Sequence, residues 1–263
     1  MSAPQLSRDE VVLRLRGAGC VFAEEEADLL LASSSSSESL SAMVERRASG
    51  VPLEHVLGWV EFCGLRIALE PGVFVPRPRT EFLVERAVAI APPGAVVLDL
   101  CCGSGAVGAA LASAVPDLRV YAADLDPVAV RCARRNLDGI GGLVFEGDLF
   151  EPLPDSLRGQ VEVLVANVPY VPSDGIAFLP SEARDHEPRL ALDGGPDGLD
   201  VLRRVAAESR RWLVPGGRLL IETSAAQAPA AVAAFAADGL AAELARSDEL
   251  DVDVVTGTAA VGG

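Results

Sequence analysis

The chain has 263 residues, enough for one large domain and a small additional one. Half of the residues are hydrophobic and only 5% are aromatic. We therefore expect a core of Ala, Val and Leu, as in α/β folds with close helix–sheet packing. The formal net charge is −16 and the chain has no lysine, which argues against binding nucleic acid through a basic surface.

The five cysteines are odd in number and include no two Cys-x-x-Cys pairs that could frame a zinc site. We expect reduced thiols and no bound metal. The sequence has no apolar run long enough to span a bilayer and no charged-then-apolar leader. These features predict a cytoplasmic protein without a membrane anchor.

Residues 1–50 lack the alternation typical of strands and show apolar residues at helical spacing. Ser7, followed by Asp9 and Glu10, fits the start of the first helix. The serine run at 33–37 is expected to connect two helices. The sequence therefore predicts a small helical domain over residues 1–50.

A different pattern covers residues 51–80. Two short apolar segments, 59–62 and 65–69, flank Gly64 and predict a β-hairpin. This hairpin is expected to link the helical domain to the rest of the chain. Thr80 is expected to cap the helix that follows it.

Residues 81–263 are expected to form one α/β domain, because short apolar segments alternate with helical ones. Strands are predicted at residues 95–100, 119–123, 143–146, 161–166, 217–222 and 251–256. Helices between most of these strands predict a largely parallel sheet covered on both faces. The Pro-Gly-Gly stretch at 215–217 is expected to be a turn before the fifth strand.

The first of these strands runs into a glycine-rich loop, Gly103-Ser104-Gly105, and then into a helix. Glycines here allow a sharp turn and the close approach of a ligand. Asp124 ends the next strand, where a carboxylate can bind both hydroxyls of a ribose. The spacing also matches an NAD-binding loop, but Asp99 before the glycines suits an ammonium group better than a pyrophosphate. We therefore disfavour an NAD oxidoreductase.

A second motif, Asn167-Val168-Pro169-Tyr170, follows the buried strand at 161–166. It presents an amide oxygen, a backbone carbonyl and an aromatic face, and the proline makes the segment rigid. Such groups can hold a planar NH2 through both of its hydrogens. With the glycine loop, they predict transfer of a methyl group to a planar amide or amino nitrogen.

With both motifs in view, the chain resembles the HemK/PrmC family of protein-(glutamine-N5) methyltransferases, which act on peptide chain release factors. The likeness covers nearly the whole chain and includes residues 74–81, 187–195 and 197–199. It implies a class I S-adenosylmethionine-dependent methyltransferase domain over residues 81–263, with a Rossmann-like, mostly parallel seven-stranded sheet. In this family a small helical domain that recognises the substrate precedes the catalytic domain.

The resemblance also implies the site residues. Those for the cofactor, S-adenosyl-L-methionine, would be Asp99, Cys101, Cys102, Gly103, Ser104, Gly105, Asp124, Leu125, Asp148, Leu149 and Asn167. The catalytic residues would be Asn167, Val168, Pro169 and Tyr170, which would hold a glutamine in the Gly-Gly-Gln loop of a release factor. The product of the cofactor would be S-adenosyl-L-homocysteine.

Three departures from the family pattern stand out. Cys101-Cys102 replaces the usual Gly-Thr, Leu149 stands where an aromatic residue often follows the acid, and Val168 replaces the first proline of Asn-Pro-Pro-Tyr. Both cysteines are small, and Val168 still supplies its carbonyl oxygen. The changes suggest a divergent member of the family whose chemistry is kept and whose acceptor protein is open.

Other acceptors fit the same motif. An N6-adenine nucleic-acid methyltransferase would hold its exocyclic amine in the same way, but the acidic charge argues against it. A small-molecule N-methyltransferase stays open as an alternative. We expect Glu187 to be a structural partner rather than a base, and Arg77 and Arg79 either to contact the acceptor or to form ion pairs. A monomer is the default expectation.

Overall fold

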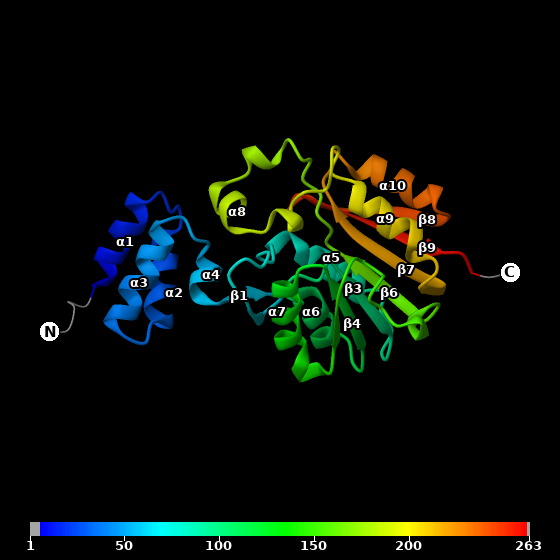
Figure 1. Cartoon of the computed structure of the whole chain (residues 1–263), viewed down its shortest axis with the longest axis horizontal. Helices are drawn as coiled ribbons and strands as arrows, with labels where there is room; N and C mark the ends of the chain where they lie inside the picture. The colour runs from blue at the N-terminus through cyan, green and yellow to red at the C-terminus, as the bar shows by residue number, and fades with distance from the viewer. Residues whose placement is uncertain (1–5, 262–263) are drawn as a thin grey trace.

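The computed structural model describes residues 6–261. Figure 1 shows a group of helices near the N-terminus, a short hairpin region beside it, and a large sheet with helices on both faces. Within residues 6–261, no helix is both long enough and apolar enough to cross a membrane. No group of three or more His, Cys, Asp or Glu side chains in this part of the chain could hold a metal ion.

Four helices form the N-terminal part: α1 (Arg8–Gly17), α2 (Ala23–Ser33), α3 (Ser37–Ala48) and α4 (Leu53–Leu57). The predicted start of α1 is confirmed, because the Ser7 side chain accepts from the Glu10 amide and the Glu10 carboxylate accepts from the Ser7 amide. This reciprocal capping satisfies two amides that have no partner within the helix. Val11, Leu15 and Leu30 are fully buried in a core of their own.

The predicted hairpin is confirmed as β1 (Trp59–Phe62) and β2 (Leu65–Ala68), which pair antiparallel. A 3₁₀ turn, η1 (Pro78–Thr80), then leads into α5 (Glu81–Val88). The expectation that Thr80 caps α5 is wrong: its φ and ψ of −68° and −14° are helical and its side chain does not bond to the helix. The 3₁₀ turn continues directly into α5, which frees the Thr80 hydroxyl for another partner.

The large sheet has seven strands in the order β5-β4-β3-β6-β7-β9-β8. They are β3 (Val96–Leu100), β4 (Arg119–Asp124), β5 (Leu143–Glu146), β6 (Val161–Ala166), β7 (Leu213–Thr223), β8 (Leu240–Ser247) and β9 (Val252–Ala259). The strands from β3 to β7 pair in parallel, whereas β9 is antiparallel to both β7 and β8. The expected α/β class with a mostly parallel sheet is confirmed.

Helices cover both faces of this sheet (Figure 1). Besides α5 they are α6 (Ala106–Ala114), α7 (Pro127–Leu137), α9 (Asp200–Ser209) and α10 (Ala228–Ala237). Side chains of α5, α6 and α7 pack on one face, and those of α9 and α10 pack on the other. A short helix, α8 (Ser181–His186), belongs to the long connection between β6 and α9.

The strand order reverses at β3, since β4 lies on one side of it and β6 on the other. Ligands of open α/β sheets bind at the carboxyl ends of the strands at such a point. Leu100 at the end of β3 pairs with Ala166 at the end of β6, so the two predicted motifs begin side by side.

Two features of the sheet differ from expectation. Strand β7 already begins at Leu213, so the stretch at 215–217 lies within the strand at a register shift and is not a turn before it. Gly217 approaches the Val161 carbonyl so closely that a Cβ would lie 2.9 Å away. Strand β8 was not predicted, because it lies at the sheet edge, where only one of its eight residues is buried and the side chains show no apolar alternation.

Candidate active site

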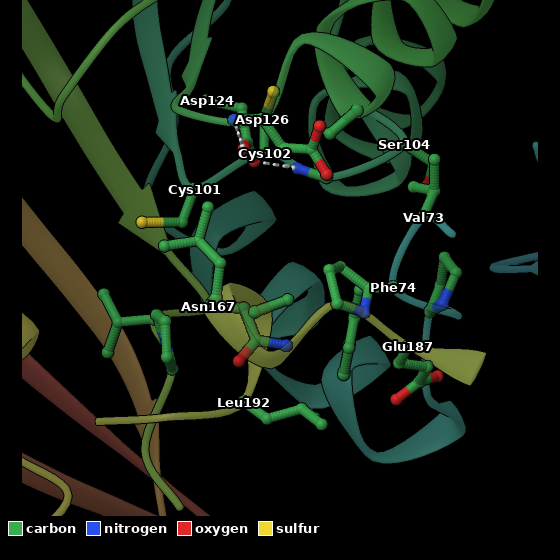
Figure 2. Close-up of a pocket in the computed structure, with 18 of the residues that line it drawn as sticks. Val73, Phe74, Cys101, Cys102, Ser104, Asp124, Asp126, Asn167, Glu187 and Leu192 are labelled. Carbon is green, nitrogen blue, oxygen red and sulfur yellow. Dashed lines mark hydrogen bonds between the residues drawn. The ribbon is translucent and has the colours of Figure 1, made fainter. Parts of the chain in front are cut away.

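A cavity of about 490 Å³ opens at the carboxyl ends of β3, β4 and β6. Its walls come from the loops after these strands, from the linker at residues 73–80, and from the connection that contains α8. Figure 2 shows Cys101, Asp124 and Asn167 around it, together with Phe74 and Glu187 from the other walls. The two sequence motifs therefore meet in one cavity.

All predicted site residues except Gly105 line this cavity. Gly105 immediately precedes α6, at its N-cap, with a left-handed φ of +77°, and a Cβ there would lie 3.2 Å from the backbone of Ala133 in α7. Its structural role is thus to allow α6 to pack closely on α7. It does not contribute to the cavity wall.

The loop after β3 is tightly turned. Cys101 and Gly103 have φ values of +53° and +54°, in the left-handed region that favours glycine. Cys101 is therefore strained where the family usually has glycine. Burial raises the pKa of the Cys101 and Cys102 thiols, which keeps both of them neutral.

Asp124 is held by backbone amides on both oxygens. Oδ2 accepts from the Gly103 amide at 2.8 Å, and Oδ1 accepts from the Asp126 amide at 2.9 Å. Figure 2 draws hydrogen bonds at this carboxylate. Burial raises its pKa, and the two backbone bonds oppose the shift. Each oxygen has a further lone pair, so the carboxylate can still accept two hydroxyl groups from a ligand.

Asp99 is buried, with 2% of its surface exposed, and its Oδ2 accepts from the Gly108 amide at 3.0 Å. Gly108 is packed closely, since a Cβ there would lie 3.1 Å from the Val120 side chain. Burial raises the pKa of Asp99 to about 7, and the charge of Asp124 adds to the shift. A cation beside such a carboxyl would favour its charged form. The site suits the ammonium group of a ligand.

The wall after β5 combines an ion pair with an apolar surface. Arg204 donates to Asp148 at 2.8 Å, and Leu149 follows with a φ of +50°. Phe150 turns into the core and stacks on Trp212 at 5.5 Å between ring centroids. The aromatic residue near this wall therefore does not face the cavity. Leu149 and the half-exposed Leu125 offer aliphatic contacts to a flat ring instead.

Asn167 follows β6 and donates from Nδ2 to the Thr80 hydroxyl at 3.2 Å. Among the described residues, none donates a hydrogen bond to its Oδ1 or to the Val168 carbonyl. We call these two oxygens the acceptor pair. Val168 is 2% exposed and its side chain packs in the core, which anchors the backbone that carries this carbonyl.

The hydroxyl of Tyr170 is fixed by charged side chains. It accepts from Arg79 at 2.6 Å and lies 3.4 Å from Oε1 of Glu222, which also accepts from Arg79 at 3.3 Å. Burial and the Glu222 charge raise the pKa of Tyr170 to about 12, so the phenol is protonated at neutral pH. Thr80 and Glu222 were not among the predicted site residues. Ala166 pairs with Ile221 in the sheet, and the residues that follow them are Asn167 and Glu222. Only this strand register would have placed Glu222 beside Asn167.

The connection that contains α8 is attached to the rest of the wall by ion pairs. Glu187 accepts from Arg77 at 2.6 Å on both oxygens and from the Val75 amide at 3.2 Å. Arg47 of α3 binds Glu182 of α8 at 2.7 Å. Both Arg77 and Arg79 thus form ion pairs, and Glu187 is bound in a structural contact.

The chemistry of the residues in the cavity wall fits S-adenosylmethionine. The buried carboxyl of Asp99 suits the ammonium group, the Asp124 carboxylate suits the ribose, and Leu149 suits the adenine. The hydroxyl of Ser104 is buried and has no partner among the described residues, so it can bond to a polar group of the ligand.

Comparisons with known proteins agree with this geometry. A family model described as the methyltransferase small domain matches residues 64–177. The chain is 40% identical over 217 residues to a release factor glutamine methyltransferase of Geobacter sulfurreducens. The aligned region covers 82% of this chain and 75% of that protein. It is 38% identical over 206 residues to the 4-amino-L-phenylalanine/4-methylamino-L-phenylalanine methyltransferase of Streptomyces pristinaespiralis, covering 74% of this chain and 69% of that protein.

The fold is also similar to that of a solved methyltransferase from Pyrococcus furiosus. The TM-score is 0.58 at 16% identity, over 84% of this chain and all of that one. At this identity the likeness concerns the fold alone. The sequence relatives carry the assignment further: the chain belongs to the release factor glutamine methyltransferase family and is an S-adenosylmethionine-dependent methyltransferase.

Proposed function

We propose that this enzyme methylates the side-chain amide nitrogen (N5) of a glutamine in a protein, namely the Gly-Gly-Gln loop of a peptide chain release factor. The observation that carries the proposal is the acceptor pair, Asn167 Oδ1 and the Val168 carbonyl, which lies in the wall of the cofactor cavity and accepts no hydrogen bond from any residue in 6–261. Relatives named for this activity support the same acceptor. Release factors act in the cytoplasm, which is where we place the enzyme.

The acceptor pair addresses the main difficulty of the reaction. A carboxamide nitrogen is a poor nucleophile because its lone pair is delocalised into the carbonyl. If Asn167 Oδ1 accepts one N–H and the Val168 carbonyl accepts the other, the nitrogen is oriented and can become pyramidal as conjugation is lost. Such orientation can lower a barrier by roughly 7–11 kcal/mol in favourable systems.

The remaining residues complete the proposed site. S-adenosylmethionine, when bound, supplies a methyl group on a sulfonium. The ring of Tyr170 would pack on the amide plane, and its protonated hydroxyl would stay bonded to Arg79. No base is required before transfer, because the nitrogen loses its proton readily only after it is alkylated. Asp99 would hold the ammonium group of the cofactor and Asp124 its ribose.

We also propose that the three parts of the chain have different roles. Residues 1–50 would recognise the acceptor protein, 51–80 would link, and 81–263 would catalyse. The ion pair of Arg47 with Glu182 supports this proposal, because it links α3 to α8 in the cavity wall. The net charge of −16 would favour approach of a basic partner.

A second candidate is methylation of an aromatic amine on a free amino acid, favoured by the similarity to the Streptomyces pristinaespiralis enzyme. A free amino acid carries an α-carboxylate that needs a cation or several donors. Three arginines of the described part of the chain line the cavity, and each is ion-paired with a carboxylate: Arg77 with Glu187, Arg79 with Glu222, and Arg204 with Asp148. This pairing favours an acceptor residue within a polypeptide.

Methyl transfer to a panel of acceptors tests the proposal. Purified enzyme with radiolabelled S-adenosylmethionine would be offered a release factor, 4-amino-L-phenylalanine or adenine-containing DNA. We expect label on the release factor, with tandem mass spectrometry locating it on a glutamine side chain. Label only on the free amino acid would establish the second candidate, and label only on DNA would refute both.

A further inference from the structure

The ring of Tyr170 lies in the cavity wall without support from the hydrophobic core. Within residues 6–261, Tyr170 belongs to none of the hydrophobic clusters. The second tyrosine of the chain, Tyr121, differs in this respect, because it packs against the cluster on the α9 and α10 face of the sheet. The direction of the Tyr170 ring therefore depends on the polar contacts at its two ends.

The backbone end of Tyr170 is held in place. Gln227, at the start of α10, donates from Nε2 to the Tyr170 carbonyl at 2.8 Å. Gly198 packs against the same carbonyl and leaves no room there for a Cβ. With the backbone fixed, the direction of the ring is set by rotation about the bond between Cα and Cβ. A contact at the hydroxyl end is then enough to fix the ring.

Arg79 makes this contact. Its Nη2 donates to the Tyr170 hydroxyl at 2.6 Å, and its Cζ lies 5.8 Å from the centroid of the ring, within the range of a cation–π contact. The hydroxyl also donates to Oε1 of Glu222 at 3.4 Å. A phenol can accept one hydrogen bond and donate another, so both contacts can exist together.

Arg79 is itself anchored to the sheet. Its Nε donates to the same oxygen of Glu222 at 3.3 Å, and the Glu222 side chain, near the end of β7, is 1% exposed. Each of the three side chains thus contacts the other two. They come from the linker, from the segment after β6 and from β7, so the contacts connect the ring to a rigid part of the fold.

We propose that Arg79 is a positioning residue that holds the Tyr170 ring against the side-chain amide of the acceptor glutamine. Arg79 acts through the Tyr170 hydroxyl and does not bind the acceptor itself. Without it, the ring can turn away and the amide loses support on one side. The inference rests on the proposed function, since it assigns the ring a part in holding the glutamine.

A double-mutant cycle distinguishes action through Tyr170 from direct contact with the acceptor. Arg79→Met removes the donors and keeps an unbranched side chain, and Tyr170→Phe removes only the hydroxyl. With the release factor as acceptor, each single change should lower kcat at least about 10-fold, toward the roughly 100-fold loss that misplacement of a reacting group can cause. The double variant should stay within about twofold of Tyr170→Phe, because Arg79 then has no hydroxyl to act on. Losses that multiply in the double variant, or a wild-type kcat in Arg79→Met, would overturn the inference.

Arg246→Met is the matched control. The side chain of Arg246 is 41% exposed, close to the 43% of Arg79, and it also pairs with a buried carboxylate, that of Asp253, at 3.1 Å. Arg246 does not line the cavity. Its substitution should leave kcat unchanged, and the Kd of S-adenosylhomocysteine should stay within about threefold in every variant. An equal loss of kcat in Arg246→Met, or a loss of cofactor binding that accompanies the loss of kcat in Arg79→Met, would contradict a specific role for Arg79.

Selective ¹³C labelling of the tyrosine rings tests the positioning without an activity assay. The chain has two tyrosines, so Tyr121 is an internal control. Relaxation of the ring carbons reports motion on the picosecond to nanosecond timescale. The Tyr170 ring should become more mobile in Arg79→Met and stay as in the wild type in Arg246→Met, with Tyr121 unchanged in both.

Unchanged relaxation of the Tyr170 ring in Arg79→Met would overturn the inference, as would an equal change at Tyr121. Failure of the proposed function gives a different result. If the wild-type enzyme does not methylate the release factor, the proposed function fails, and the relaxation measurement still decides whether Arg79 holds the ring.

Discussion

The two sides of the cavity are held in different ways. On the cofactor side, Asp99 and Asp124 accept from the amides of Gly108 and Gly103, which are 9 and 21 residues away. Around the acceptor pair, the contacts are between two side chains that are further apart in the sequence. Asn167 contacts Thr80, 87 residues away, and the Tyr170 hydroxyl contacts Arg79, 91 residues away.

This difference determines how well each side of the cavity tolerates substitutions. A backbone amide is present whatever the side chain, so the cofactor loop can accept Cys101-Cys102 in place of Gly-Thr without losing these contacts. The acceptor side depends on the identity of several distant side chains, including Glu222. We therefore expect substitutions on the cofactor side to alter affinity by degrees and substitutions on the acceptor side to alter turnover sharply.

The largest effect is expected for Asn167→Ala. Loss of one oxygen of the acceptor pair should lower kcat by about 100-fold or more, because the nitrogen is no longer oriented. Titration calorimetry should give an unchanged Kd for S-adenosylhomocysteine. Equal loss of cofactor binding and of turnover would mean that Asn167 supports the fold of the whole cavity. The cofactor side and the acceptor side would then not act independently.

Asp124→Ala should act mainly on the cofactor. Removal of the carboxylate eliminates charge-assisted hydrogen bonds worth about 1.5–3 kcal/mol, so the Kd of S-adenosylhomocysteine should rise roughly 10- to 100-fold. Calorimetry measures the effect, with the exposed Asp138→Ala as a control for charge. An unchanged Kd in Asp124→Ala would exclude Asp124 from cofactor binding.

Cofactor affinity should also depend on pH through Asp99. Its pKa is raised to about 7, so the carboxyl is charged above this pH and neutral below it. Because an ammonium group prefers the charged form, the Kd of S-adenosylhomocysteine should rise about tenfold for each pH unit below 7. Asp99→Asn should bind more weakly and lose this dependence. A flat profile for the wild-type enzyme between about pH 5.5 and 8.5 would show that Asp99 does not meet the ammonium group.

The smallest effect concerns strain in the cofactor loop. Cys101 has a φ of +53°, so Cys101→Gly should raise the free energy of unfolding by about 0.5–1 kcal/mol. Cys102 is buried and is not among the residues with positive φ, so Cys102→Gly should lower it. Urea denaturation measures both. Destabilisation by Cys101→Gly would mean that packing of the thiol outweighs the strain.

The sequence predicted those parts of the molecule that local patterns determine. The capping of α1 by Ser7, the hairpin at Gly64, and strands β3 to β6 followed from spacing and residue type. The edge strand β8 was missed because its exposed side chains carry no alternation. Position 80 shows the limit most clearly: a threonine before Glu-Phe-Leu-Val is a good helix cap by local rules, yet its hydroxyl binds Asn167. No local pattern contains a contact across 87 residues.

A crystal structure with S-adenosylhomocysteine and a glutamine-containing peptide tests the acceptor pair most directly. We expect the N5 nitrogen of the peptide glutamine at about 2.7–3.2 Å from both Asn167 Oδ1 and the Val168 carbonyl, with Nδ2 still on Thr80. A glutamine bound with its nitrogen away from these oxygens, or an Asn167 amide reversed toward the substrate, would contradict the proposed chemistry.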